Sequence, residues 1–99
     1  MDWRVILMLD EPNDLGWWVY IIETKCKKLY TGITTDVARR FQEHLAVHRK
    51  ESDKGAKFFR GHEPNRVVYQ EAYGSRSVAS KREYEIKKMS ALKKRSLIT

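Results

Sequence analysis

Two strand-like segments separated by four polar residues most constrain how this chain can fold. Residues 17–24 and 29–34 are rich in tryptophan, tyrosine, isoleucine and threonine, residue types that are typical of β-strands. The connection Lys25-Cys26-Lys27-Lys28 is short enough to join two neighbouring antiparallel strands. The sequence therefore predicts a β-hairpin in the first third of the chain.

The pattern after the hairpin predicts helices and one further strand. A helix capped by Thr35 or Asp36 is expected to run to about His48. The other expected elements are a short helical turn near residues 56–60, a strand over 66–73, a helix capped by Ser75 or Ser77 that ends near Met89, and a short helix over 90–97. The predicted fold is therefore α+β, a small three-stranded antiparallel sheet (the N-terminal β-hairpin plus one later strand) flanked by three or four helices.

The length of 99 residues fits one domain. We expect residues 17–99 to form this domain and residues 1–16 to form an N-terminal extension. Within the extension, an edge strand over residues 3–9 and a flexible tail are both open alternatives. The apolar run at residues 5–9 is too short to span a bilayer and lacks the features of a signal peptide.

Basic residues outnumber acidic ones and favour a polyanionic partner. Lys and Arg total 20 while Asp and Glu total 13, which gives a net charge of +7. On a small domain this excess favours nucleic acid, with DNA expected and RNA still open. A solvated basic surface is the alternative. A membrane partner is not expected, because the basic residues are spread along the chain and do not lie on one amphipathic helix.

The single cysteine, Cys26, bears on both metal chemistry and compartment. One cysteine excludes an internal disulfide and any zinc site built on cysteine pairs. A reducing, cytoplasmic location is therefore expected. The sequence does not determine the oligomeric state, and a monomer is favoured.

The first predicted helix brings a basic and a titratable side chain toward the sheet. Its apolar stripe, at about 100° per residue, consists of Val37, Phe41 and Leu45. Arg40 and His44 fall on or beside this stripe, whereas Arg39 falls on the solvent side. An arginine held there can direct its planar guanidinium at one phosphate. Packing of its apolar stem over the core edge is the alternative.

His44 and His48 are separated by four residues, a spacing that can bind zinc on one helix face. The residues between them are apolar, however, so the glutamate of the zinc-protease motif is absent. We therefore expect no zinc site. A packing role is the alternative for each histidine.

Tyr20 and Tyr30 lie on the two strands of the predicted hairpin and are expected to be near neighbours. Each alone is typical of an ordinary strand aromatic. A tyrosine acts as a general base only when its pKa falls from its usual value near 10. A nearby arginine and a bound cation would both cause that fall.

The long C-terminal helix offers a carboxylate for a metal. Glu83 and Glu85 both flank its apolar stripe, so periodicity does not choose between them. The residues of that stripe are Val78, Ala79, Ile86 and Met89. Magnesium needs only one or two protein carboxylates, because water and substrate phosphate complete its shell. A salt bridge is the alternative role for either glutamate.

The chain thus carries Trp18-Val19-Tyr20-Ile21 and Leu29-Tyr30-Thr31-Gly32-Ile33, followed by Arg40, His44 and Glu83. In this order and spacing the residues resemble the GIY-YIG nuclease superfamily. Residues 29–44, 54–57 and 80–87 look like its short stand-alone bacterial branch, which is similar to the nuclease domains of excision-repair enzymes and of group I intron homing endonucleases. The chain departs from the motif names at Trp18, Val19 and Thr31.

The resemblance implies a DNA endonuclease that uses Mg²⁺ or Mn²⁺ to hydrolyse phosphodiester bonds. It assigns Tyr20 or Tyr30 to the activation of water, Arg40 to the scissile phosphate and Glu83 to the metal. His44 would assist proton transfer or orient a tyrosine. Since no separate specificity domain is expected, we predict weak sequence preference, selectivity for DNA structure, and a setting in DNA repair or recombination.

Two other functions stay open. One is a non-catalytic nucleic-acid-binding module on the same fold, and the other is a protein-interaction domain with an acidic partner.

Further basic residues are predicted to bind nucleic acid. Lys54, Lys57 and Arg60 lie in a loop with Phe58 and Phe59, which can stack on bases, although we expect at least one of these phenylalanines in the core. Lys87 and Lys88, on the C-terminal helix, are the last candidates. Their alternative is a solvated helix face.

Overall fold

The computed structural model describes residues 16–53 and 55–99. Three antiparallel strands form one sheet in the order β2-β1-β3. These strands are β1 (Trp17–Thr24), β2 (Leu29–Thr34) and β3 (Pro64–Tyr73). The helices are α3 (Val37–His48), the 3₁₀ helix η1 (Lys57–Arg60), α4 (Arg76–Lys87) and α5 (Ala91–Ile98). The α+β prediction is confirmed.

The element boundaries agree closely with the sequence pattern. Both hairpin strands have the predicted bounds, and Asp36 and Ser75 are the caps of α3 and α4. The third strand begins earlier than predicted, at Pro64, because a proline is tolerated as the first residue of an edge strand. The predicted N-terminal extension lies almost wholly in residues 1–15, outside the described residues, so its edge strand or tail stays a prediction.

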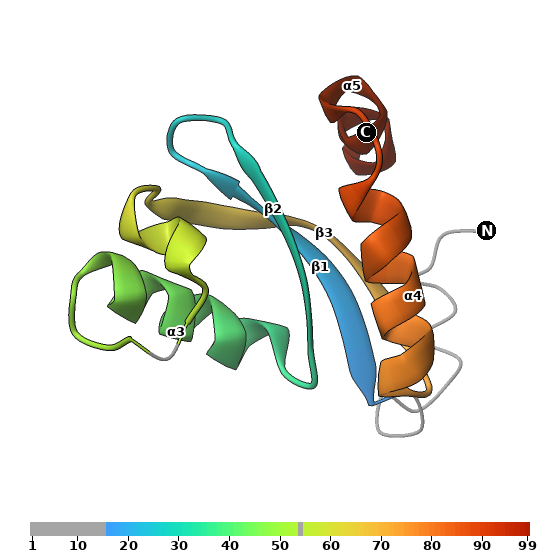
Figure 1. Cartoon of the computed structure of the whole chain (residues 1–99), viewed down its shortest axis with the longest axis horizontal. Coiled ribbons are helices and arrows are strands. Elements are labelled where there is room, and N and C mark those ends of the chain that lie inside the picture. The colour runs from blue at the N-terminus through green and yellow to red at the C-terminus, as the bar shows by residue number, and fades with distance from the viewer. Residues whose placement is uncertain (1–15, 54) are drawn as a thin grey trace.

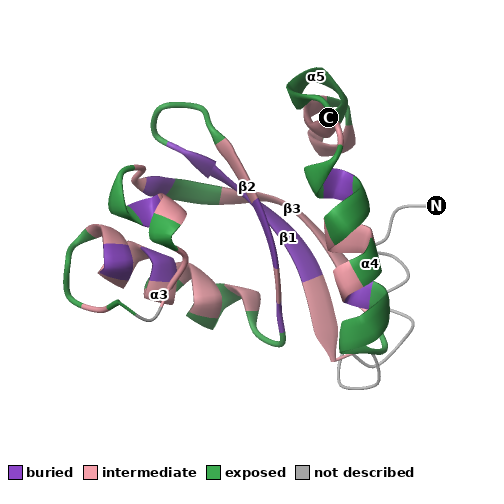
Figure 2. Ribbon diagram, viewed as in Figure 1, coloured by how far each residue is buried: buried purple, intermediate pink, exposed green. Residues whose placement is uncertain are grey.

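The sheet is covered on both faces by helices (Figure 1). On one face, Val19 and Ile21 of β1 pack with Ala79 and Ile86 of α4. On the other face, Tyr20 and Ile22 pack with residues of α3 and η1. The central strand is therefore buried along most of its length (Figure 2), and its fully buried apolar residues face two different cores.

The two predicted helix stripes need correction. In α3, Leu45 belongs to neither buried cluster, and the buried residues are His44 and Val47. In α4, Val78 is 47% exposed. Adjacent helix positions diverge by about 100°. Burial of Ala79 against the sheet therefore leaves Val78 on the side, and the contact of His44 with the hairpin rotates Leu45 away from the core.

Two ion-pair clusters fix the C-terminal helices on the sheet. Arg82 of α4 donates from Nε to Glu71 of β3 at 2.9 Å, and the hydroxyls of Tyr69 and Tyr73 donate to the same carboxylate. In the second cluster, Arg95 of α5 bonds the buried carboxylate of Glu23 in β1. The first cluster restricts where the residue next to Arg82, Glu83, can lie.

Candidate active site

The first motif tyrosine lies across the glycine of the second motif. Tyr20 is paired with Gly32 in the hairpin register. A Cβ atom at position 32 would lie 2.5 Å from the Tyr20 hydroxyl oxygen and 2.7 Å from its Cζ. Only glycine leaves room for this ring. Tyr20 is 1% exposed, so the close approach places its hydroxyl inside the domain.

The Tyr20 hydroxyl forms a hydrogen bond with His44. The oxygen lies 2.8 Å from His44 Nε2, and both side chains are buried. Burial, aided by the charge of Arg40, lowers the pKa of His44 to about 4, which leaves the imidazole neutral at neutral pH.

The Tyr20 hydroxyl has a second partner besides His44. Arg40 interacts with the same hydroxyl, and a guanidinium can only donate. The Tyr20 hydroxyl therefore accepts from Arg40 while it shares a hydrogen bond with His44 Nε2. His44 Nδ1 is buried without a hydrogen-bond partner in the described part of the chain.

Tyr30 lies in the same cluster but is less buried. Its ring centroid is 6.3 Å from that of Tyr20 and 5.3 Å from that of His44. The ring stacks on Phe58 and meets Phe59 edge-on. The two tyrosines are diagonal neighbours, because Tyr30 is paired with Ile22 across the hairpin.

The pKa of each tyrosine is raised above its ordinary value. Burial is the main cause for Tyr20, and Tyr30 adds to it while Arg40 opposes it. Burial also raises the pKa of Tyr30, again against Arg40. The groups of the protein therefore leave both hydroxyls protonated at neutral pH, and a general base would need a further nearby cation.

Arg40 is held at the edge of this cluster. Its side chain is 28% exposed, and its Nη1 donates to Glu43 Oε1 at 2.9 Å. Arg39 is exposed, as the helical wheel predicts. Arg40 is thus restrained on one side by Glu43 while it interacts with Tyr20 on the other.

Glu83 and Glu85 have different surroundings. The charge of Glu83 acts on both Tyr20 and Tyr30, which puts this carboxylate on the side of α4 toward the hairpin. Its side chain is 22% exposed, whereas that of Glu85 is 61% exposed and bonds Arg82. The geometry therefore favours Glu83 for the metal role that the sequence left between the two.

The residues around Glu83 fit a magnesium-type ion that has few protein ligands. Within residues 16–53 and 55–99, no group of three or more His, Cys, Asp or Glu side chains could hold a metal. Glu83 alone suffices for a hard cation that takes its other oxygens from water and phosphate. Lys87 Nζ lies 3.3 Å from Glu83 Oε2, so a cation already stands beside this carboxylate.

The predicted nucleic-acid-binding residues are dispersed. Lys57 and Arg60 are exposed on η1. Lys87 pairs with Glu83, and Lys88 lies over the Tyr84 ring, with Nζ 4.7 Å from the ring centroid. Lys54 lies outside the described residues. Of the two phenylalanines, Phe59 is in the core, as predicted, and Phe58 is half-buried.

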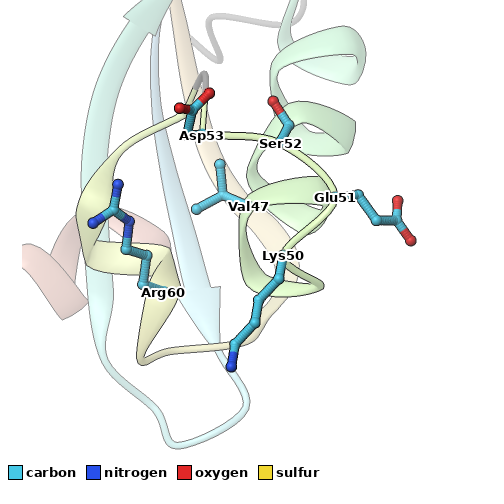
Figure 3. A pocket seen from close by; sticks show the side chains of 6 residues that line it. All are labelled: Val47, Lys50, Glu51, Ser52, Asp53 and Arg60. Atoms are coloured by element: carbon cyan, nitrogen blue, oxygen red, sulfur yellow. The ribbon is translucent and has the colours of Figure 1, made fainter.

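Arg60 also lines a hollow at the C-terminal end of α3 (Figure 3). The hollow has a volume of about 540 Å³. Its charged lining residues are Lys50, Glu51, Asp53 and Arg60. Two basic and two acidic side chains offset each other, so this hollow has no marked preference for anions.

Sequence reasoning missed residues that join the site only through tertiary contacts. Glu43 holds Arg40, and Trp17 and Arg76 line a groove with it. The spacing of Glu43, three residues after Arg40, is a recognisable ion-pair signal on a helix. Trp17 and Arg76 are far apart in the chain and carry no comparable signal.

Comparisons with known proteins show the family of the chain. The GIY-YIG catalytic domain family matches residues 16–96. UPF0213 protein DP2720 of Desulfotalea psychrophila is 48% identical over 88 residues, which cover 89% of this chain and 76% of that protein. UPF0213 protein YhbQ of Escherichia coli is 43% identical over a match that covers 83% of this chain and 76% of that protein.

A solved structure is also similar to this chain. The solution structure of UPF0213 protein BH0048 from Bacillus halodurans matches with a TM-score of 0.50 and 43% identity, over 83% of this chain and 81% of that one. In the part of the chain that the structure describes, no helix has the length and apolar character needed to cross a membrane. The chain belongs to the GIY-YIG family, a nuclease-type family, in its stand-alone UPF0213 branch.

Proposed function

We propose that this protein is a metal-dependent endonuclease that hydrolyses phosphodiester bonds in DNA, with weak sequence preference and selectivity for DNA structure. One observation carries the proposal. A partly exposed arginine and a partly exposed glutamate, Arg40 and Glu83, both act on the same pair of tyrosines. That combination provides a cation for the phosphate, a carboxylate for a metal and hydroxyls for proton transfer.

Tyr30 is the better candidate for the group that activates water. The Tyr20 hydroxyl is buried and already engaged by His44 and Arg40, whereas Tyr30 is only half-buried. In the proposed reaction, Tyr30 first loses its proton to solvent beside a bound cation, and its oxygen then accepts a proton from the attacking water. The water oxygen bonds to phosphorus as the P–O bond to the leaving strand breaks, and the leaving oxygen takes a proton from solvent. Tyr20 and His44 position Arg40, which binds the phosphate oxygens and stabilises their developing charge.

Mg²⁺ or Mn²⁺ held by Glu83 would polarise the phosphate and lower the pKa of a neighbouring hydroxyl. The metal would then replace Lys87 as the partner of Glu83. A cytoplasmic location and a role in DNA repair or recombination belong to the same proposal. The oligomeric state stays a prediction.

Cleavage of a panel of linear and branched DNA and RNA substrates with Mg²⁺ or Mn²⁺ tests the proposal. Glu83→Gln should reduce the cleavage rate by at least about 100-fold, since a metal supplies several kcal/mol of charge stabilisation. Binding of DNA should persist. Glu85→Gln is the matched control and should cut at nearly the wild-type rate.

Two outcomes would contradict the proposal. If the wild-type protein binds DNA but cuts none of the substrates with either metal, a non-catalytic binding module is the correct description. If Glu83→Gln cuts as fast as the wild type, the metal assignment is wrong.

A further inference from the structure

A groove beside the tyrosine cluster is assembled where four elements end or begin. Strand β1 starts there, β2 ends there, and both α3 and α4 begin there. The groove has a volume of about 250 Å³. Its lining includes Trp17, Thr34, Arg39, Arg40, Glu43 and Arg76.

The charges that line this groove are mainly positive. Among the described residues of the lining, Glu43 is the sole acidic one, and it is bonded to Arg40. Arg39 and Arg76 therefore add positive charge to the groove beyond what Glu43 offsets. This balance differs from that of the larger hollow near Arg60, where acidic and basic residues are equal in number.

Arg39 of α3 and Arg76 of α4 each have one weak side-chain contact in the groove. Arg39 Nη2 donates to Thr35 Oγ1 at 3.3 Å on α3. The Arg76 guanidinium carbon lies 5.9 Å from the centroid of the Trp17 ring, within the range of a cation–π contact. Both side chains are exposed, so solvent and solutes reach them.

Arg39 and Arg40 are consecutive on α3, so their side chains diverge by about 100°. Such a pair is poorly placed to grip one phosphate together but suits two successive phosphates of one strand. We propose that Arg39 and Arg76 bind the substrate phosphate next to the one held by Arg40. The groove is thus a nucleic-acid subsite that positions the strand for cleavage. This inference rests on the nuclease function proposed above.

The test is binding of a fluorescein-labelled branched DNA in metal-free buffer over a series of salt concentrations. Arg39→Ala and Arg76→Ala should each weaken binding by about threefold to tenfold, as expected for a partly exposed charged hydrogen bond. The salt dependence should also become shallower by about one unit of log K against log salt, since one phosphate contact is lost. With Mg²⁺ present, KM should rise more than kcat falls.

Arg49→Ala is the matched control, because it removes the same charge from the exposed far end of α3. It should leave affinity and salt slope nearly unchanged. Arg76→Gln keeps a long stem near Trp17 and should lose as much affinity as Arg76→Ala. Urea unfolding of each variant checks that the fold is retained.

The outcomes separate this proposal from the nuclease proposal. If the wild type binds and cuts DNA while both groove variants bind with the wild-type affinity and slope, the groove proposal is wrong and the nuclease proposal stands. An equal loss in Arg49→Ala also overturns it, because a diffuse field would then explain the effect. If the groove variants weaken binding but the wild type cuts no substrate, the nuclease proposal falls and the groove remains.

Discussion

The two faces of the sheet differ although alternate residues of one strand supply both. Toward α4, Val19 and Ile21 contribute aliphatic side chains to an aliphatic core. Toward α3, Tyr20 joins Tyr30 and His44 in a cluster of aromatic and titratable groups. The fully buried cluster toward α4 is thus apolar, whereas the cluster toward α3 holds polar groups at fixed positions inside an apolar setting.

The polar groups of the two faces are also used differently. On the α4 face, Glu71 accepts from Arg82, Tyr69 and Tyr73, and these bonds hold its pKa below the ordinary value although burial opposes them. On the α3 face, His44 keeps one buried nitrogen without a partner among the described residues. A buried polar atom without a partner carries a desolvation cost, so His44 Nδ1 calls for an explanation that the paired Glu71 carboxylate does not.

The largest expected effect on stability comes from a change in the apolar cluster toward α4, which we call the aliphatic face. Ile21→Ala should lower the free energy of unfolding by about 2–5 kcal/mol, because a fully buried side chain is replaced by a cavity. Urea unfolding measures this loss. The cleavage rate per folded molecule should stay near that of the wild type, and a large fall in this rate would show that the two faces are not separate in function.

Gly32→Ala should disturb the aromatic face, which is the cluster of Tyr20, Tyr30 and His44 toward α3. The new methyl group would collide with Tyr20, and overpacking of this kind costs about 1–3 kcal/mol of stability. The displaced Tyr20 should also release Arg40, so cleavage should fall more than stability alone explains. Gly74→Ala is the control, since no atom lies within 4 Å of a Cβ atom there. Equal behaviour of the two variants would contradict the assigned role of Gly32.

Acid should destabilise the fold through His44. The pKa of His44 is about 4 in the folded protein and near 6.5 in the unfolded chain. Between these values the unfolded chain binds more protons, so stability is present above pH ~6.5 and is lost as pH falls toward 4. The expected loss from about pH 7.5 to about pH 5 is about 2 kcal/mol.

Urea unfolding at the two pH values measures this loss. His44→Gln should lack it, because the variant has no group that titrates at this position. A wild-type stability that stays constant over the same interval would contradict the neutral, buried state assigned to His44.

The smallest effects on stability distinguish the two tyrosines. Tyr20→Phe should cost about 1 kcal/mol, because His44 Nε2 loses its partner. Tyr30→Phe retains the ring contacts with Phe58 and Phe59 and should change stability by less than about 0.5 kcal/mol. Cleavage should show the stronger response in Tyr30→Phe, by about 10²-fold or more. A greater rate loss in Tyr20→Phe would transfer the water-activating role to Tyr20.

Much of the fold was predictable because its signals are local. The hairpin followed from residue type and a short polar link, and helix caps such as Asp36 and Ser75 followed from their side-chain chemistry. The rotation of α3 about its own axis was not predictable from local signals, because the contact of His44 with Tyr20 joins residues 24 positions apart. The inclusion of Leu45 and Val78 in helix stripes was wrong for the same reason.

By itself, the sequence determined the strands, the helices, the basic charge and the order of Tyr20, Tyr30, Arg40, His44 and Glu83, which carries the family resemblance. Only the tertiary structure decided that Tyr20 is closed over Gly32, that Glu83 rather than Glu85 lies toward the hairpin, and that Arg39 and Arg76 share a groove. Local patterns set backbone conformation, whereas burial, pKa and groove charge depend on side chains that meet only after β1 is enclosed between two strands and two layers of helices.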